Sequence, residues 1–309
     1  MITHENRLIH SIYLSKKKRE KNNLNKFLGN SNFYYSFARH AILSAFKALD
    51  IKENKRVLLP SLICRDVLSC FYQIGVIPIY YKVNENLQLN EDLDKFDDIC
   101  AIIIVNYFGF PQKIEPYINF SKKRKIPIIE DNAHGFLSND ELGTPLGTRC
   151  DIGIFSIRKT LPVENAAVLS INNMEVIKNP LQQEYFLHTS TSLNYKIKNI
   201  FQKTIPYFGL YPINICTKVK RALNKLRFNH TVDLSDNEKN LPEPRYLNKN
   251  SLELLKYFNI ESEKKRRRDL YKYCSNYLYK FKIKPVFPVL PDQTIPYVFP
   301  FYADASEID

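Results

Sequence analysis

Short, almost wholly apolar stretches alternate with helix-like segments along the first half of the chain, and this alternation restricts the fold more than any other feature. The apolar stretches include Arg56–Pro60 (RVLLP), Ala101–Asn106 (AIIIVN) and Ile126–Glu130 (IPIIE). Strands that are apolar along their whole length are buried on both faces, which is typical of parallel sheets. Helical spacing of apolar residues in Arg39–Leu49 and Ile114–Lys123 supplies the covering helices. We therefore expect an α/β fold with a mostly parallel sheet and helices on both faces.

The same alternation continues on either side of these segments. Further strands are expected at Val76–Val83, Asp151–Ser156 and Ala166–Ile171, and further helices at Asp66–Ile74, 246–258 and 261–281. Between Asn179 and Pro244 the pattern is weaker and is interrupted by prolines, which break helices. We therefore place a domain boundary near residue 240, between a large domain of residues 1–240 and a smaller one of residues 241–309.

Composition bears on both the backbone conformation and the cellular setting of the chain. The chain contains 8 glycines in 309 residues, well below the usual level of about 7%, so each remaining glycine is expected to have a conformational reason. No run of 18 apolar residues is present, and Met1–Leu8 lacks the apolar core of a signal peptide. None of the six cysteines stands at CxxC spacing, so we expect free thiols in the cytoplasm and no metal site.

The chain is strongly basic, with 45 Lys and Arg against 32 Asp and Glu, a net charge of +13. The excess is concentrated at Lys16–Arg19, Lys122–Lys125 and Lys264–Arg268, which we interpret as solvated helix faces. A net positive charge favours association with anions of many kinds and does not single out nucleic acid. Nucleic acid is therefore not expected as a partner. The helix that contains the last run also has an apolar side that we expect to pack on its own domain, made of Leu270, Tyr273, Tyr277, Leu278 and Phe281.

Candidate catalytic side chains follow two of the predicted strands. Ile126–Glu130 runs into Asp131 and His134, and Asp151–Phe155 runs into Ser156 and Lys159. Ligands of open α/β sheets bind at the carboxyl ends of strands, so these side chains are expected at one edge. An aspartate can keep a pyridine nitrogen protonated and a lysine can form a Schiff base, which fits an imine-forming cofactor. Taken singly, the residues also fit a strand-end carboxylate, a core histidine and a surface lysine.

Six short segments between Phe33 and Ile171 stand in a fixed order along the chain: Arg56–Ser61 (RVLLPS), Ile74–Tyr80 (IGVIPIY), Val105–Pro111 (VNYFGFP), Ile128–His134 (IIEDNAH), Cys150–Ser156 (CDIGIFS) and Lys159–Leu161 (KTL). In this order they resemble the motifs of the DegT/StrS-type sugar aminotransferases. Each match is weak alone, and their common order and spacing make the resemblance specific.

The resemblance implies the large domain of a fold-type-I transferase that depends on pyridoxal phosphate, followed by a small α+β domain that is incomplete at Asp309. It implies transfer of an amino group from an amino acid to a keto-sugar, in a homodimer. Lys159 resembles the lysine that binds the cofactor and moves the substrate proton. Asp131 resembles the partner of the ring nitrogen, and His134 the partner of the phenolic oxygen. The phosphate is expected near Ser156, Ala38 and Arg39, at the N-terminus of the first helix.

The sequence also departs from the family pattern. Phe37-Ala38-Arg39 replaces the usual Ser-Gly-Thr, and Cys64 stands where many members carry an aromatic residue over the cofactor ring. Ala166 and Ala167 replace glycines, and the spacing from Ser156 to Lys159 is shorter than is common. A truncated or degenerate homologue that keeps the fold without turnover is therefore the alternative hypothesis.

Overall fold

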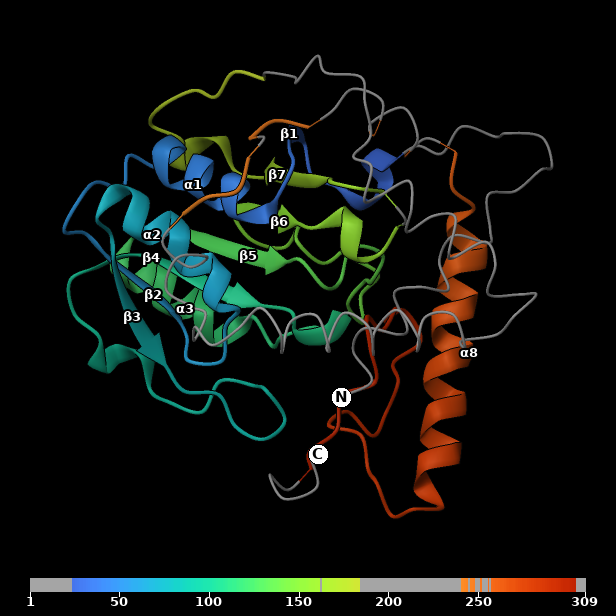
Figure 1. Cartoon of the computed structure of the whole chain (residues 1–309). Helices are drawn as coiled ribbons and strands as arrows, with labels where there is room; N and C mark the ends of the chain where they lie inside the picture. Colours follow the sequence, from blue (N-terminus) through green and yellow to red (C-terminus); the bar gives the residue numbers. More distant parts are fainter. Residues whose placement is uncertain are drawn as a thin grey trace, which may run out of the picture.

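The computed structural model describes residues 24–161, 163–183, 240–243, 245–247, 251, 255 and 257–303. Within these residues a seven-stranded sheet has the strand order β1-β7-β6-β5-β4-β2-β3 (Figure 1). The four inner pairings between β6 and β3 are parallel, whereas β7 runs antiparallel to both β6 and β1. The strands are β1 (Ser31–Tyr35), β2 (Arg56–Pro60), β3 (Ile77–Tyr81), β4 (Ile99–Val105), β5 (Ile128–Asn132), β6 (Ile152–Phe155) and β7 (Ala167–Ile171).

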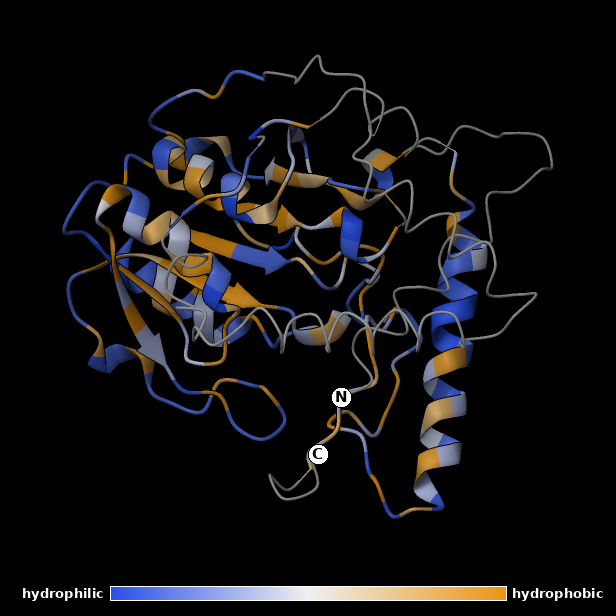
Figure 2. Cartoon of the chain, in the orientation of Figure 1, coloured by the Kyte–Doolittle hydropathy of each residue, from blue (hydrophilic) through white to orange (hydrophobic). Residues whose placement is uncertain are grey.

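The mostly parallel sheet that the apolar stretches predict is confirmed. The sequence analysis missed β1, an edge strand whose half-buried residues lack the continuous apolar pattern of the inner strands. It also ended β5 too early, because Asp131 and Asn132 still pair with Ile154 and Phe155 of β6. Figure 2 shows β5 changing from hydrophobic to hydrophilic at its carboxyl end. The polar residues of the candidate site therefore lie within the sheet edge itself.

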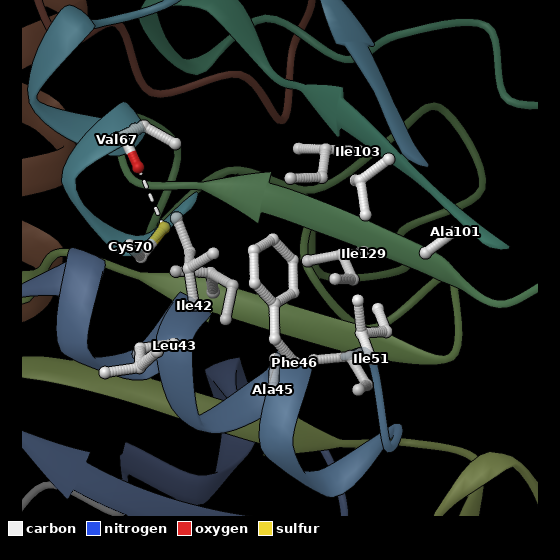
Figure 3. Packing of buried hydrophobic residues seen from close by; sticks show 14 of the residues in the cluster. Ile42, Leu43, Ala45, Phe46, Ile51, Val67, Cys70, Ala101, Ile103 and Ile129 are labelled. Carbon is white, nitrogen blue, oxygen red and sulfur yellow. Dashed lines mark hydrogen bonds between the residues drawn. The ribbon is translucent and has the colours of Figure 1, made fainter. Parts of the chain in front are cut away.

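Two predicted helices cover one face of the sheet. They are α1 (Ala38–Ala48) and α2 (Leu68–Ile74), and α2 ends at Gly75, whose φ of 68° is the left-handed conformation that glycine favours. The face is packed with buried aliphatic and aromatic side chains, including Ile42 and Phe46 of α1 against Ile103 and Ile129 of the sheet (Figure 3). This packing fixes the N-terminus of α1 relative to the sheet edge.

The opposite face is covered by α3 (Glu115–Arg124), whose Tyr117 and Phe120 are buried against Ile102, Ile104 and Ile128. The prediction that helices cover both faces is therefore confirmed. Short 3-10 turns connect several elements at the carboxyl edge, among them η3 (Arg65–Val67), η5 (Tyr107–Gly109) and η6 (Ile157–Lys159).

The long helix α8 (Ile260–Tyr279) lies beside this edge of the sheet (Figure 1). The predicted helix is confirmed, whereas its buried face was predicted only in part: Leu278 packs against the core as expected. Arg267, from the basic run that we expected in solvent, has only 5% of its side chain exposed. Tyr273 and Phe281, which we expected to pack, are 66% and 60% exposed. Arg267 belongs to the buried face because five backbone and side-chain acceptors meet its guanidinium, whereas Tyr273, Tyr277 and Phe281 stack on one another.

The segment after α8 returns to the sheet edge and docks there through its backbone. Ile295 N–H donates to Ser138 Oγ at 2.9 Å, and Tyr297 N–H donates to the Phe108 carbonyl at 2.7 Å. The predicted helix at 246–258 and the residues Lys16–Arg19 and Cys216 fall largely or wholly outside the described residues. The domain boundary near residue 240 follows residues 184–239, which are not described, and stays a prediction.

Candidate functional site

A cavity of about 310 Å³ opens at the carboxyl ends of β4, β5 and β6, beside the N-terminus of α1. Its wall brings together all six residues that were selected from the sequence, although they come from three separate segments. They are Ala38, Arg39, Asp131, His134, Ser156 and Lys159. Polar groups that converge on one mostly apolar cavity are typical of a ligand site.

Asp131 lies at the base of this cavity with 6% of its surface exposed. Its Oδ1 accepts the N–H of Ala133 at 2.9 Å. Burial raises the pKa of the Asp131 carboxyl above its ordinary value, while the Ala133 N–H and the charge of Lys159 act in the opposite direction. A carboxylate in this setting is stabilised by a cationic partner placed in the cavity.

Lys159 ends the turn η6, directly after β6. Its Nζ lies 2.9 Å from Nε2 of His134. The other ring nitrogen of His134, Nδ1, accepts the backbone N–H of Phe108 at 3.4 Å. Phe108 adopts a left-handed conformation with φ 55°, which is uncommon for a residue with a side chain. The tight turn η6 also explains the short spacing from Ser156 to Lys159, because both residues still line the cavity.

The far end of the cavity is suited to an anion. Phe37 occupies the N-cap position of α1 and makes no side-chain capping bond, and the first N–H groups of a helix favour negative charge. Two guanidiniums lie near the Phe37 ring, with Cζ of Arg39 at 5.9 Å and Cζ of Arg158 at 5.1 Å from its centroid. Arg39 also forms an ion pair with Asp66 at 3.3 Å. The sequence analysis gave no role to Phe37, Arg158 or Asp66, because no spacing rule links them.

The departures from the family pattern have local consequences. Cys64 lines the cavity as an exposed thiol, and no aromatic ring occupies its position. Ala166 and Ala167 are fully buried next to or within β7, so the replaced glycines stand at packed positions.

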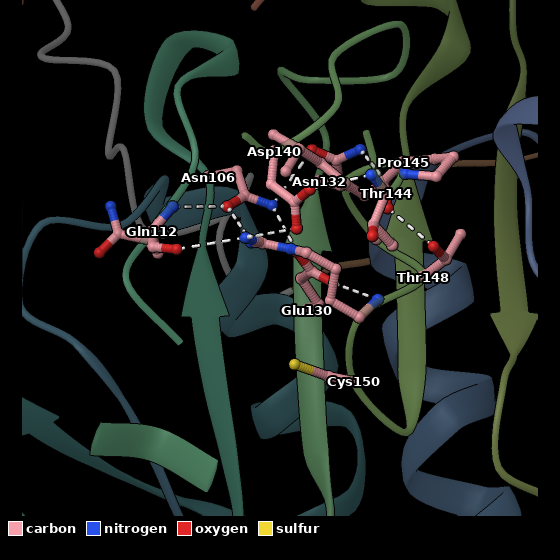
Figure 4. Close-up of polar contacts among 12 residues, drawn as sticks. Asn106, Gln112, Glu130, Asn132, Asp140, Thr144, Pro145, Thr148 and Cys150 are labelled. Carbon is pink, nitrogen blue, oxygen red and sulfur yellow. Dashed lines mark hydrogen bonds and ion pairs between the residues drawn. The ribbon is translucent and has the colours of Figure 1, made fainter. Parts of the chain in front are cut away.

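A buried polar network around Glu130 supports the end of β5 (Figure 4). Successive side chains of a strand alternate between its faces, so this network lies on the face opposite Asp131. Arg149 donates through Nε and Nη2 to Oε1 of Glu130, at 2.8 and 2.6 Å, and both side chains are almost fully buried. Asn106 accepts from Arg149 at 3.0 Å and donates to Glu130 at 2.9 Å. The sequence analysis missed this network, since Arg149 lies on a loop 19 residues after its partner.

Comparison with known proteins identifies the family. The sequence profile of the DegT/DnrJ/EryC1/StrS aminotransferase family matches residues 20–173. Residues 20–173 belong to this family. The resemblance to DegT/StrS-type proteins is therefore confirmed, and all six predicted cavity residues fall within the matched segment.

One curated member of the family matches at moderate identity. The UDP-4-amino-4,6-dideoxy-N-acetyl-beta-L-altrosamine transaminase of Campylobacter jejuni subsp. jejuni serotype O:23/36 (strain 81-176) is 30% identical over 149 residues. The alignment covers 45% of this chain and 39% of the transaminase, so the chain matches about two fifths of this relative's length.

Solved structures of the family confirm the fold. NtdA of Bacillus subtilis, determined with bound cofactor PMP, matches 92% of this chain and 59% of its own, with a TM-score of 0.57 and 18% identity. A DegT DnrJ EryC1 StrS aminotransferase from Brucella abortus matches 95% of this chain and 73% of its own, with a TM-score of 0.52 and 16% identity. The chain thus has the α/β fold of the fold-type-I aminotransferases.

Two features are absent from the described part of the chain. No helix there combines the length and apolar character needed to cross a membrane. No group of three or more His, Cys, Asp or Glu side chains in the same part of the chain is arranged to hold a metal ion.

Proposed function

We propose that this chain is an aminotransferase that uses pyridoxal phosphate to move an amino group from an amino acid to a nucleotide-linked keto-sugar. Such a reaction belongs to the synthesis of amino sugars for surface polysaccharides. Family membership and the name of the Campylobacter jejuni relative support the reaction class. The observation that carries the proposal is the convergence of Lys159, Asp131 and the N-terminus of α1 on one cavity.

The residues of the cavity fit the cofactor. Among the interactions described above, no cation forms a hydrogen bond with the buried carboxyl of Asp131. The protonated ring nitrogen of the cofactor would supply such a cation. Arg39, Arg158 and the backbone N–H groups of the first turn of α1 suit a phosphate. The cavity volume of about 310 Å³ lies at the lower end of the range for small-molecule sites.

When bound, pyridoxal phosphate supplies an aldehyde carbon that reacts with amines and a ring that withdraws electrons. Lys159 supplies the amine for that carbon through Nζ, and the same atom is placed to accept and return a proton. Asp131 holds the proton on the ring nitrogen, and His134 orients both Nζ and the phenolic oxygen. Ser156, Ala38 and Arg39 bind the phosphate.

The proposal extends to the setting of the enzyme. We place it in the cytoplasm as a homodimer, with a keto-sugar and an amino-acid donor as its small-molecule partners and without nucleic acid. The net charge of +13 suits a substrate that carries a diphosphate.

The test is an absorbance scan of the purified chain with pyridoxal phosphate. We expect a Schiff-base band near the visible edge, trapped by borohydride as a mass addition on Lys159. The Lys159→Ala variant should lose the band, while the matched surface variant Lys122→Ala should keep it. A trapped adduct of equal yield in Lys159→Ala would contradict the assignment of the lysine.

A second stage separates the proposal from its alternative. Addition of amino-acid donors should convert the bound cofactor to its amine form, and keto-sugars should reverse the conversion. Cofactor binding without either half-reaction across panels of donors and sugars would instead support a homologue that keeps the fold without turnover.

A further inference from the structure

The ring of His134 is held by groups from two distant parts of the chain. It lies nearly parallel to the ring of Tyr297, with centroids 4.8 Å apart and planes at 6°. It is also parallel to Phe108, at 5.6 Å and 2°. Tyr297 lies outside residues 20–173, the part matched by the family profile. The ring plane of His134 is therefore set partly by a residue that the matched segment does not contain.

The hydrogen bonds made in this ring plane determine which nitrogen of His134 carries the proton. A backbone N–H can only donate, so the bond from Phe108 requires Nδ1 to be an acceptor. The neutral imidazole then carries its proton on Nε2, which faces Nζ of Lys159 at 2.9 Å. When Lys159 gives up its proton, Nε2–H can donate to the lone pair of the neutral amine, which is the form of lysine that attacks an aldehyde.

One buried guanidinium joins the backbones that carry Lys159 and Tyr297. Arg267 of α8 donates through Nη2 to the carbonyls of Thr160 at 3.0 Å and Lys159 at 3.4 Å. Through Nη1 it donates to the carbonyls of Pro296 and Tyr297, both at 3.2 Å. Its Nε donates to Glu263 at 2.7 Å. All five donors of an arginine thus have acceptors, and four of these acceptors belong to the two segments beside the cavity.

We infer that Tyr297 and Arg267 are positioning residues for Lys159, an inference that rests on the proposed function. Tyr297 keeps the imidazole of His134 in the plane that hydrogen-bonds Nζ. Arg267 keeps the Tyr297 backbone in register with the turn that carries Lys159. The carboxyl-terminal part of the described chain therefore completes a site whose chemical groups all come from the family-matched segment.

The test on Tyr297 uses a substitution that removes the ring and one that keeps it. In the cofactor-free protein, wild type should show nitrogen NMR signals of His134 for a single Nε2–H tautomer, assigned with the variant His134→Gln. Tyr297→Leu should give mixed-tautomer signals and slow the formation of the Lys159 adduct by about three- to tenfold, on the scale of one aromatic pair. Tyr297→Phe keeps the ring and should therefore show the wild-type tautomer signals and the wild-type rate of adduct formation. Tyr302→Leu, an exposed tyrosine of the same segment, should change neither.

The outcomes separate this inference from the proposed function. Unchanged nitrogen signals and an unchanged rate of adduct formation in Tyr297→Leu would overturn the inference while the function stands. If wild type forms no adduct with pyridoxal phosphate, the proposed function is wrong. In that case, the nitrogen NMR signals of the cofactor-free variants alone show whether Tyr297 fixes the orientation of the His134 ring.

The test on Arg267 has a matched control one residue further along α8. Arg268 donates to the carbonyls of Pro291 and Thr294 in the same returning segment and has no described contact with Lys159 or Tyr297. Arg267→Met should lower the hydrogen-exchange protection of the Tyr297 amide and slow the Lys159 adduct at least as much as Tyr297→Leu. Arg268→Met should leave the adduct rate within about twofold of wild type. Equal effects of the two variants, with helical content retained, would overturn the role of Arg267.

Discussion

Asp131 occupies a position in the candidate site that is unfavourable for a charged carboxylate without a ligand. Its carboxyl group is almost fully buried at the end of β5, and one backbone N–H, that of Ala133, donates to it. Burial raises its pKa, so the charged form is costlier in the folded chain than in the unfolded one. A buried carboxylate that destabilises the cofactor-free protein and can pair with a protonated cofactor ring is typical of a functional rather than a structural position.

This cost predicts that Asp131→Asn stabilises the cofactor-free protein at neutral pH. A raised folded-state pKa means that the favourable contribution of Asp131 is present below the unfolded pKa of about 4 and is lost as the pH rises through the folded value. The melting temperature of the variant should therefore exceed that of wild type at pH 7, and the difference should shrink as the pH falls towards 4. Asp292→Asn, at an exposed carboxylate, should show no such trend.

The same experiment with pyridoxal phosphate should reverse the order. The amide that Asp131→Asn introduces cannot hold a proton on the ring nitrogen as a carboxylate does, so the cofactor should stabilise wild type more than the variant. Equal stabilisation of both proteins by the cofactor would argue against Asp131 as the partner of the ring.

At the scale of elements, the end of β5 combines two sets of polar residues because successive side chains of a strand point to opposite faces. Asp131 faces the cavity, whereas Glu130 and Asn132 join the buried network on the other face (Figure 4). The ion pair between Glu130 and Arg149 ties the strand to the loop before β6. Both elements that supply the site are thus held by contacts outside the cavity.

Glu130→Gln should therefore destabilise the fold strongly. The substitution leaves the guanidinium of Arg149 buried beside a neutral amide, and loss of one partner of a buried pair costs about 3–5 kcal/mol. Urea unfolding should show this loss as a lower midpoint. Asp97→Asn removes the partner of Arg124 in an exposed pair and should cost about 1 kcal/mol or less. Similar losses for the two variants would show that the buried network contributes little to stability.

At the scale of the whole molecule, the segment after α8 approaches the sheet edge at Gly109. A Cβ atom built on Gly109 would lie 2.5 Å from the carbonyl oxygen of Ile295, too close for any side chain. Gly109 also has a φ of 94°, a conformation that glycine adopts at little cost. The absence of a side chain at this one position lets two regions far apart in the sequence share a backbone interface.

Gly109→Ala should therefore release the returning segment from the edge. We expect faster hydrogen exchange at the Tyr297 amide, which bonds to Phe108, and a stability loss above the roughly 1–2 kcal/mol of a left-handed alanine. Gly143→Ala is the matched control, because Gly143 has a φ of 84° and its nearest neighbour would be 3.6 Å from a Cβ. It should lose about 1–2 kcal/mol and keep the Tyr297 amide protected. Equal exchange in the two variants would contradict the close approach at Gly109.

Several features of the fold follow from sequence patterns, since they depend on local preferences. Continuous apolar runs predicted the inner strands, and helical spacing with a terminal glycine predicted α1 and α2. Strand β1 was not predicted, because an edge strand needs no continuous apolar run and its polar first residues resemble a loop. The burial of Arg267 on α8 was not predicted, because hydropathy gives an arginine an exposed position and takes no account of the five acceptors that surround it.

The sequence by itself determined the class of the sheet, the family and the residues that carry the candidate chemistry, because these depend on order and spacing along the chain. Only the tertiary structure showed that Ala38, Asp131 and Lys159 share one cavity. The tertiary structure alone revealed that Arg267 donates hydrogen bonds to the backbone carbonyls of Lys159 and Tyr297. Such contacts join residues from separate segments of the chain through shape and hydrogen-bond geometry, which no local pattern records.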